Sequence, residues 1–165
     1  MIAVLEPAQL RTARLILEPV PLDTARRVVA GDLSGLKRGE GWPHADTRSG
    51  LRMALRGGHT PGWFVFRDGL VIGDCGVHGE PQDGVVELGF GLAEPYRGQG
   101  YGSELVAALV GWLSAQPAVT TVAGRARRDN IASHRVMERA GMARVGSDGD
   151  YVRFERCRIA QSAGP

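Results

Sequence analysis

Apolar and polar residues follow two different periods along this chain, and the first is that of β-strands. Residues 63–67 and 70–78 are apolar runs on either side of Asp68-Gly69, a two-residue turn typical of a β-hairpin. Residues 85–92 form a third apolar run after another turn signal. Together the three runs predict a meander of neighbouring strands.

A helical period dominates residues 100–115, where apolar side chains fall on one stripe: Leu105, Val106, Leu109, Val110 and Leu113. The other expected elements are helices at 22–30, 47–56 and 130–140, and strands at 12–17, 119–123, 142–145 and 150–159. The order β, α, α, β, β, β, α, β, α, β, β predicts an α+β fold, with a mixed sheet and helices on its faces. We expect residues 1–165 to form a single domain.

Composition excludes several classes of protein. An apolar fraction of 43% is ordinary for a globular chain, and a net charge of +2 gives no basis for nucleic-acid binding. Apolar runs fall short of the roughly 20 residues that span a bilayer, and the first ten residues lack a secretory pattern. The four histidines lack metal-ligand spacing, so we expect no metal site. Cys75 and Cys157 are far apart, which is typical of free thiols in a cytoplasmic protein.

Residues 97–102, Arg-Gly-Gln-Gly-Tyr-Gly, are the most informative stretch, because three glycines alternate where a helix begins. The first N–H groups of a helix have no partners and carry partial positive charge, and glycine lets a ligand approach them. The pattern predicts a cradle for a phosphate or pyrophosphate; the alternative is that the glycines only permit a tight turn. The stretch lacks the lysine of a Walker loop, and Ser103 stands where a dinucleotide fingerprint needs its last glycine.

Arg97-x-x-Gly100-x-Gly102 resembles the Arg/Gln-x-x-Gly-x-Gly/Ala motif of the GNAT superfamily of acyl-CoA-dependent N-acetyltransferases. Asn130-x-x-Ser133, with the residues up to Gly141, is similar to the second signature of the RimJ/RimL-like branch. Residues 12–17, Trp42-Pro43 and 84–90 also fit that branch.

The resemblance implies a mostly antiparallel GNAT-type sheet. Its fourth strand, 85–92 here, carries a bulge in the family and splays from the fifth strand, 119–123, to open a cleft for acetyl-CoA. The implied reaction is transfer of acetyl to a primary amine, either a protein N-terminus or a small molecule, by direct attack in a ternary complex. The alternative is a non-catalytic module that binds or senses acyl-CoA.

The resemblance also implies which residues bind coenzyme A. Backbone groups of Phe90, Gly91 and Leu92 pair with the pantetheine amides. Asn130 caps the helix expected at 130–140 and, with Ser133, contacts the cofactor. The pyrophosphate is held by backbone N–H groups, those of Arg97, Gly98, Gln99, Gly100, Tyr101 and Gly102. The side chain of Tyr101 is expected to pack in the protein rather than to bind the ligand.

Two residues are the candidates for proton transfer. Glu87 places a charge in an apolar strand, where it is costly unless paired or functional; it is either the base, acting through a water, or the partner of an arginine on a neighbouring strand. Ser133 matches the serine that protonates the departing sulfur in the branch, or is an ordinary first-turn residue. The chain departs from family patterns at Met137, where many members have a tyrosine acid, and at Arg125, where others have a glutamate.

The acceptor pocket is expected from residues 31–62 and the final strands, with the lining Trp42, His44, His59, Trp63 and His78. Arg125, Arg127 and Arg128 form either an ordinary solvated loop or a site for an acidic acceptor or the adenosine phosphate of coenzyme A. The identity of the amine and the formation of a homodimer are left open.

Overall fold

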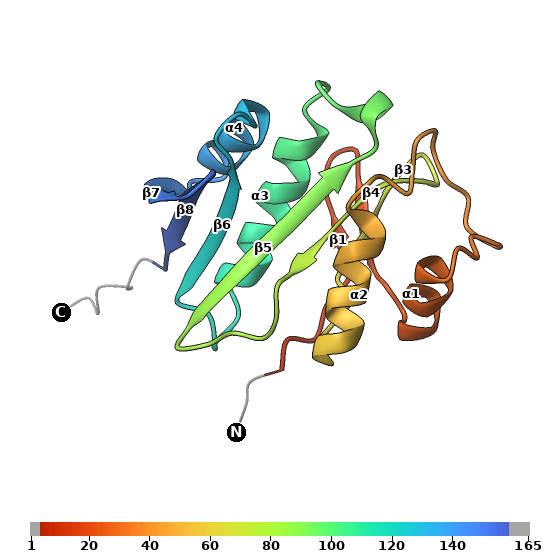
Figure 1. Cartoon of the computed structure of the whole chain (residues 1–165), viewed down its shortest axis with the longest axis horizontal. Helices are drawn as coiled ribbons and strands as arrows, with labels where there is room; N and C mark the ends of the chain where they lie inside the picture. The colour runs from red at the N-terminus through yellow and green to blue at the C-terminus, as the bar shows by residue number, and fades with distance from the viewer. Residues whose placement is uncertain (1–3, 159–165) are drawn as a thin grey trace.

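The computed structural model describes residues 4–158, which form an eight-stranded sheet with two helices on each face (Figure 1). The strand order is β1-β2-β3-β4-β5-β6-β8-β7, and every pair is antiparallel except β5 with β6. The expected α+β fold and mostly antiparallel sheet are therefore confirmed. The strands are β1 (Leu10–Arg11), β2 (Ile16–Pro19), β3 (Trp63–Arg67), β4 (Leu70–Val77), β5 (Val85–Leu92), β6 (Thr121–Arg127), β7 (Ala143–Asp148) and β8 (Tyr151–Cys157). The helices are α1 (Leu22–Val29), α2 (Thr47–Gly57), α3 (Tyr101–Ser114) and α4 (Ile131–Arg139), with a 3-10 turn η1 (Glu94–Tyr96).

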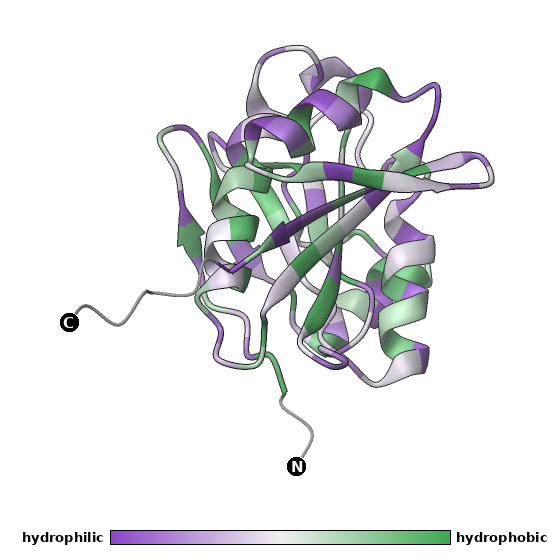
Figure 2. Ribbon diagram, turned by 90° about the vertical axis from the view of Figure 1, so that its left-hand side faces the viewer, coloured by the Kyte–Doolittle hydropathy of each residue, from purple (hydrophilic) through white to green (hydrophobic). Residues whose placement is uncertain are grey.

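Each face of the sheet has its own core, because each pair of helices presents an apolar stripe to it. The predicted stripe of α3 is fully buried, and it packs with Trp63 and Phe154. The smaller core on the side of α1 and α2 contains Trp42, Phe64 and Val71. Figure 2 shows hydrophobic and hydrophilic residues alternating along the strands and helices, as expected for elements that each turn one side toward a core.

The cleft arises where β5 and β6 part. Their parallel pairing runs only from Val85↔Thr121 to Glu87↔Ala123. Beyond that point β5 continues against β4, while β6 continues against β8. One edge of β5 after Glu87 is therefore left without β6 as a neighbour. The expected bulge is absent over these residues of the described chain, because the register with β4 is unbroken from Gly73↔Leu92 to Val77↔Leu88.

Two predicted strands have different bounds. Residues 12–17 contain a turn: the Thr12 side chain accepts the Leu15 N–H at 2.9 Å, so the chain reverses between β1 and β2. The alternating pattern extends across this turn, so the pattern alone does not distinguish the turn from a continuous strand. The strand expected at 119–123 instead runs from Thr121 to Arg127, because pairing with β8 holds its polar end. Residue 159 of the last predicted strand, and residues 1–3 of the N-terminal segment, lie outside the described residues.

Candidate active site

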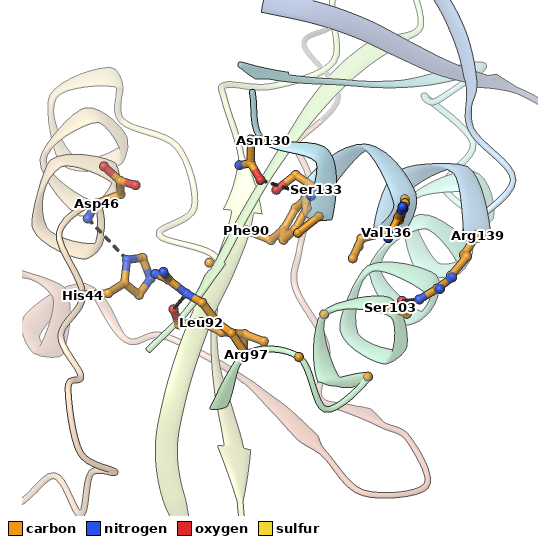
Figure 3. A pocket seen from close by; sticks show the side chains of 16 residues that line it. His44, Asp46, Phe90, Leu92, Arg97, Ser103, Asn130, Ser133, Val136 and Arg139 are labelled. Atoms are coloured by element: carbon orange, nitrogen blue, oxygen red, sulfur yellow. Dashed lines mark hydrogen bonds between the residues drawn. The ribbon is translucent and has the colours of Figure 1, made fainter. Parts of the chain in front are cut away.

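A groove of about 650 Å³ runs between the end of β5, the loop after it and the first turns of α3 and α4 (Figure 3). We call it the donor cavity. Nine of the eleven residues predicted to bind coenzyme A line it: Phe90, Gly91, Leu92, Arg97, Gly98, Gly100, Gly102, Asn130 and Ser133. The side chains of the other two have different partners. Gln99 donates to the Pro95 carbonyl at 2.9 Å, and Tyr101 is buried with its hydroxyl accepting from Arg67.

The glycine loop presents backbone donors to this groove. Gly98 and Gly100 have φ of +73° and +84°, a left-handed conformation that favours glycine. Within the described chain the start of α3 has no side-chain cap, so its first N–H groups are left for an anion. Arg97 borders the same groove, and its Nε donates to the Leu92 carbonyl at 3.0 Å.

Arg14 supports the loop from behind. Its Nη1 donates to the Gln99 carbonyl at 3.0 Å, its Nε lies 2.8 Å from the Glu104 carboxylate, and its guanidinium stacks on the Tyr101 ring. These contacts hold the loop on the opening segment of the chain, which is 85 residues away in sequence.

Asn130 and Ser133 lie at the first turn of α4. The Asn130 side chain accepts the Ser133 N–H at 3.2 Å, so it is a helix cap, as expected from the sequence. The Ser133 side chain faces the groove (Figure 3). Met137, at the place of the family's tyrosine, is only 1% exposed and packs in the core.

A second cavity of about 570 Å³ lies beside α2, β4, β5 and β6, and we call it the acceptor cavity. It shares five lining residues with the donor cavity: His44, Asp46, Phe90, Asn130 and Ser133. The two cavities therefore meet at this junction, with His44 and Asp46 coming from the segment at the start of α2 and Ser133 from α4 (Figure 3). A donor in one cavity and an acceptor in the other would meet there.

Glu87 lies on β5 where β5 and β6 begin to separate. Its Oε1 is 3.1 Å from Arg125 Nε on β6 and 3.5 Å from His78 Nδ1. The contact with His78 is the largest cause that lowers the pKa of Glu87, and the charges of Arg125 and Arg153 act in the same direction against partial burial. The carboxylate is thus ionised near neutral pH and paired with an arginine on the neighbouring strand. His78 and Arg125, rather than Glu87 itself, line the acceptor cavity.

Sequence reasoning missed Asp74, which accepts from three side chains. His44 Nε2 lies 3.1 Å from its carboxylate, Trp42 Nε1 donates at 2.9 Å and Thr47 Oγ1 at 2.7 Å. The signal was present, because Asp74 is an acidic residue inside the apolar strand β4, the same feature that singled out Glu87.

Two glycines of β5 make room for imidazoles. A Cβ on Gly91 would lie 2.6 Å from His44 Cε1, and a Cβ on Gly89 would lie 2.7 Å from His78 Nε2. Glu87, Gly89 and Gly91 alternate along the strand, so they share one face of it. That face carries one carboxylate and two imidazoles in a row beside the junction.

The acceptor cavity differs in part from the expected lining. His44 and His78 line it, but Trp42 and Trp63 are buried in the two cores, and the His59 ring turns to the Thr60 carbonyl at 3.1 Å. Arg125 and Arg127 also line the cavity, whereas Arg128 donates to the Gly149 carbonyl. Both tryptophans are buried because the free energy gained by removing an indole ring from water exceeds what the ring would gain by lining a cavity.

The splayed parallel pair, the open helix start and the groove between α3 and α4 define an acyl-CoA-dependent transferase. The chain belongs to the acetyltransferase (GNAT) domain family, which matches residues 14–143. It is an acetyl-CoA-dependent N-acetyltransferase, and the family and cofactor expected from the sequence are confirmed.

Several known proteins are similar to this chain. The uncharacterized N-acetyltransferase YjdG of Bacillus subtilis (strain 168) is 23% identical over 158 residues, covering 86% of this chain and 94% of that protein. A structure of RimL, a ribosomal L7/L12 alpha-N-protein acetyltransferase in complex with coenzyme A, has a TM-score of 0.66 at 19% identity, covering 91% and 98% of the two chains. The aminoglycoside acetyltransferase AAC(6')-Ib in complex with coenzyme A has a TM-score of 0.63 at 20% identity, covering 87% and 95%.

Two further expectations concern absences. Among residues 4–158, no helix has the length and apolar character needed to cross a membrane. The same part of the chain holds no group of three or more metal-ligating side chains.

Proposed function

We propose that this enzyme transfers acetyl directly from acetyl-CoA in the donor cavity to a primary amine in the acceptor cavity. The observation that carries the proposal is the junction, where five residues border both cavities. Two substrates bound at once on either side of it can react without a covalent enzyme intermediate. Burial raises the pKa of the Cys75 thiol in the acceptor cavity, which keeps it protonated and argues against a cysteine-linked acyl group.

The donor site is assigned as follows. The edge of β5 that β6 leaves offers the N–H and C=O groups of Phe90 and the N–H of Leu92 to the amides of the pantetheine arm, whereas the backbone groups of Gly91 face β4 and the Leu92 carbonyl already accepts from Arg97. The glycine loop and the first turn of α3 hold the pyrophosphate. Ser133 at the junction donates its hydroxyl proton to the sulfur as the carbon–sulfur bond breaks and takes a proton back from solvent in the open groove, with its backbone fixed by the Asn130 cap.

Glu87 and His78 together accept the first proton from the acceptor. A primary amine arrives as an ammonium ion and must lose one proton before its lone pair can attack. His78 lines the acceptor cavity and its Nδ1 faces Glu87, so Nε2 can take the proton while the carboxylate stabilises the imidazolium. The sequence leaves Glu87 as either a base that acts through a water or the partner of an arginine; we propose that the His78 imidazole takes the position of that water.

The acceptor is a primary amine of a peptide N-terminus or of a small polyamine-like or aminosugar compound. RimL acts on a protein α-amino group and AAC(6')-Ib on aminoglycosides, so both classes occur among proteins of this fold. We further infer a cytoplasmic enzyme from Cys75 and Cys157, which are both free thiols in the described part of the chain.

A single-turnover assay tests the proposal. Enzyme in excess over acetyl-CoA is mixed with N-terminal peptides, aminoglycosides and polyamines in turn, and release of the coenzyme A thiol is followed. We expect release with at least one class, and Ser133→Ala slows it while acetyl-CoA still binds. Release at the rate of background hydrolysis with every amine would show instead a module that only binds acyl-CoA.

A further inference from the structure

Two arginines of β6 line the acceptor cavity from the face of the strand opposite to the core under α3. Arg125 and Arg127 are two residues apart, so their side chains share one face of β6. Tyr151 of β8 is the register partner of Arg127 and lines the same cavity. Both guanidiniums lie near its ring, with their Cζ atoms 5.1 Å and 6.0 Å from the ring centre. The ring thus holds two positive groups together in one wall of the cavity.

The two arginines differ in how far their charge is already compensated. Arg125 Nε forms the 3.1 Å ion pair with Glu87. Arg127 Nε lies 3.8 Å from the Asp129 carboxylate, beyond hydrogen-bond distance, and the Asp129 side chain is 84% exposed. Water and salt screen an exposed pair of this kind, so it contributes little. The charge of Arg127 is therefore left largely uncompensated in this wall.

The opposite wall of the cavity carries the opposite sign, since β6 and α2 lie on either side of β5 (Figure 1). Asp46 is exposed at the start of α2 and borders both cavities, so it favours an ammonium ion at the junction. Asp74 already accepts from three side chains. Arg127 begins one tight turn from the same junction, because its carbonyl accepts the Asn130 N–H at 3.0 Å. A negative and a positive group therefore flank the place where the amine reacts.

We propose that Arg127, assisted by the outer nitrogens of Arg125, binds a carboxylate of the acceptor, so that the substrate is an amine with an acidic group close to its reacting nitrogen. The inference rests on the proposed function and narrows its acceptor class. A guanidinium presents its N–H donors as a flat fork that matches the two oxygens of a carboxylate. A single negative charge also fits the site, because Glu87 already compensates Arg125 and would repel a doubly charged phosphate.

The same wall disfavours acceptors with several positive charges. Polyamines and aminosugars carry further ammonium groups near the reacting one, and in this cavity those groups would lie against Arg125 and Arg127. The other nearby arginines have partners elsewhere. Arg153 faces the same side of the sheet but lies 3.4 Å from the Glu155 carboxylate, and Arg128 donates to a backbone carbonyl. The preference for an acid is therefore assigned first to Arg127.

The test compares Arg127→Gln with the control Arg128→Gln, which removes the same charge from the neighbouring residue. The Arg127 side chain is 59% exposed, so its replacement should leave the fold intact, and thermal unfolding checks this. Each enzyme is assayed with two matched pairs of acceptors: amidated peptides that begin with aspartate or asparagine, and glycine or glycinamide. The difference in amine pKa within a pair is the same for every enzyme, so a change in the ratio of kcat/KM between enzymes reports on recognition of the acid.

We expect the wild type to favour the acid about 10-fold in at least one pair, at equal concentrations of free amine, as a charge-assisted hydrogen bond at a partly exposed site gives. The pair that shows the preference tells whether the carboxylate belongs to a peptide or to a free amino acid. Arg127→Gln should lose the preference through a higher KM with kcat largely kept, because a group remote from the reacting atoms is bound alike before and during the reaction. Arg128→Gln should keep the preference, and Arg127→Glu should reverse it.

Binding of the same acceptors is measured by calorimetry in the presence of coenzyme A, which has no acetyl group to transfer. The ratio of Kd values for acid and amide should follow the same pattern. A wild type that does not distinguish acid from amide overturns the inference, as does a preference that survives in Arg127→Gln or is lost equally in Arg128→Gln. A polyamine or aminoglycoside that reacts better than every acid overturns it too, with the proposed function intact. If the wild type acetylates no amine, the proposed function fails, and the Kd ratio by itself decides whether the carboxylate site exists.

Discussion

Replacing Gly100 by alanine tests the role of the glycine loop, and Gly98→Ala is its internal comparison. Both residues have positive φ, and a non-glycine residue in that conformation costs about 1–2 kcal/mol. At Gly98 the new Cβ points into open space within the described chain. At Gly100 it would lie 3.1 Å from Arg14 Nη2, so Arg14 must shift.

The two variants therefore differ mainly in the Arg14 contact. That side chain holds the Gln99 carbonyl and Glu104, and weakening those bonds adds about 1 kcal/mol to the cost at Gly100. For a chain of this length about 1 kcal/mol lowers Tm by roughly 2–4 °C. Gly98→Ala should then melt about 2–8 °C below the wild type, and Gly100→Ala about 2–4 °C lower still. Gly111→Ala, on the exposed side of α3 with space around it, should instead raise Tm slightly, because alanine favours a helix interior.

The assay is thermal unfolding with and without coenzyme A. At 100 times its Kd, a ligand adds about 2.7 kcal/mol, and a tenfold loss of affinity removes about half of this. We expect the coenzyme A shift of Gly100→Ala to be roughly halved, because the displaced loop no longer presents its donors together. If both glycine variants melt alike and retain the full shift, Arg14 does not support the loop and the pyrophosphate site must be sought elsewhere.

Three further predictions concern the pairs behind the cavities. Glu87→Gln should destabilise the protein most near neutral pH. Because the pKa of Glu87 is lower in the folded protein than the unfolded value of 4.5, its ionised form adds stability above that value, and this stability is lost as the pH falls through the folded pKa. Urea unfolding should therefore show the difference in unfolding free energy between wild type and variant shrinking at acid pH. A difference in unfolding free energy that stays constant with pH would show that the ionised Glu87 pair does not stabilise the fold. Thr47→Val removes the 2.7 Å donor to Asp74 and should cost about 1.5–3 kcal/mol in the same assay, more than Thr60→Val. Gly124→Ala brings a Cβ to 2.7 Å from Met137 Sδ and should cost about 1–3 kcal/mol by overpacking, whereas a neutral result would mean that α4 shifts freely.

The sequence by itself determined the elements whose signals are local. The Asp68-Gly69 turn, the apolar stripe of α3 and the glycines before it depend on backbone conformation and side-chain period within a few residues, and the structure has them where they were expected. Asn130 caps α4 for the same reason, since a cap acts over three positions. Similarity of motifs in the correct order then identified the family and its cofactor.

Only the tertiary structure decided which side chains form the acceptor side of the site. Asp74 meets His44 and Trp42 across 30 and 32 residues, and Glu87 meets Arg125 on a strand that follows a whole helix later. The turn at Thr12 is likewise held by Glu104, 92 residues away. No window of sequence contains both partners of such contacts; they depend on strand order and register, because these bring distant residues onto one face of the sheet. The donor groove could be predicted from a motif, and the contacts that surround Asp74 and Glu87 could not.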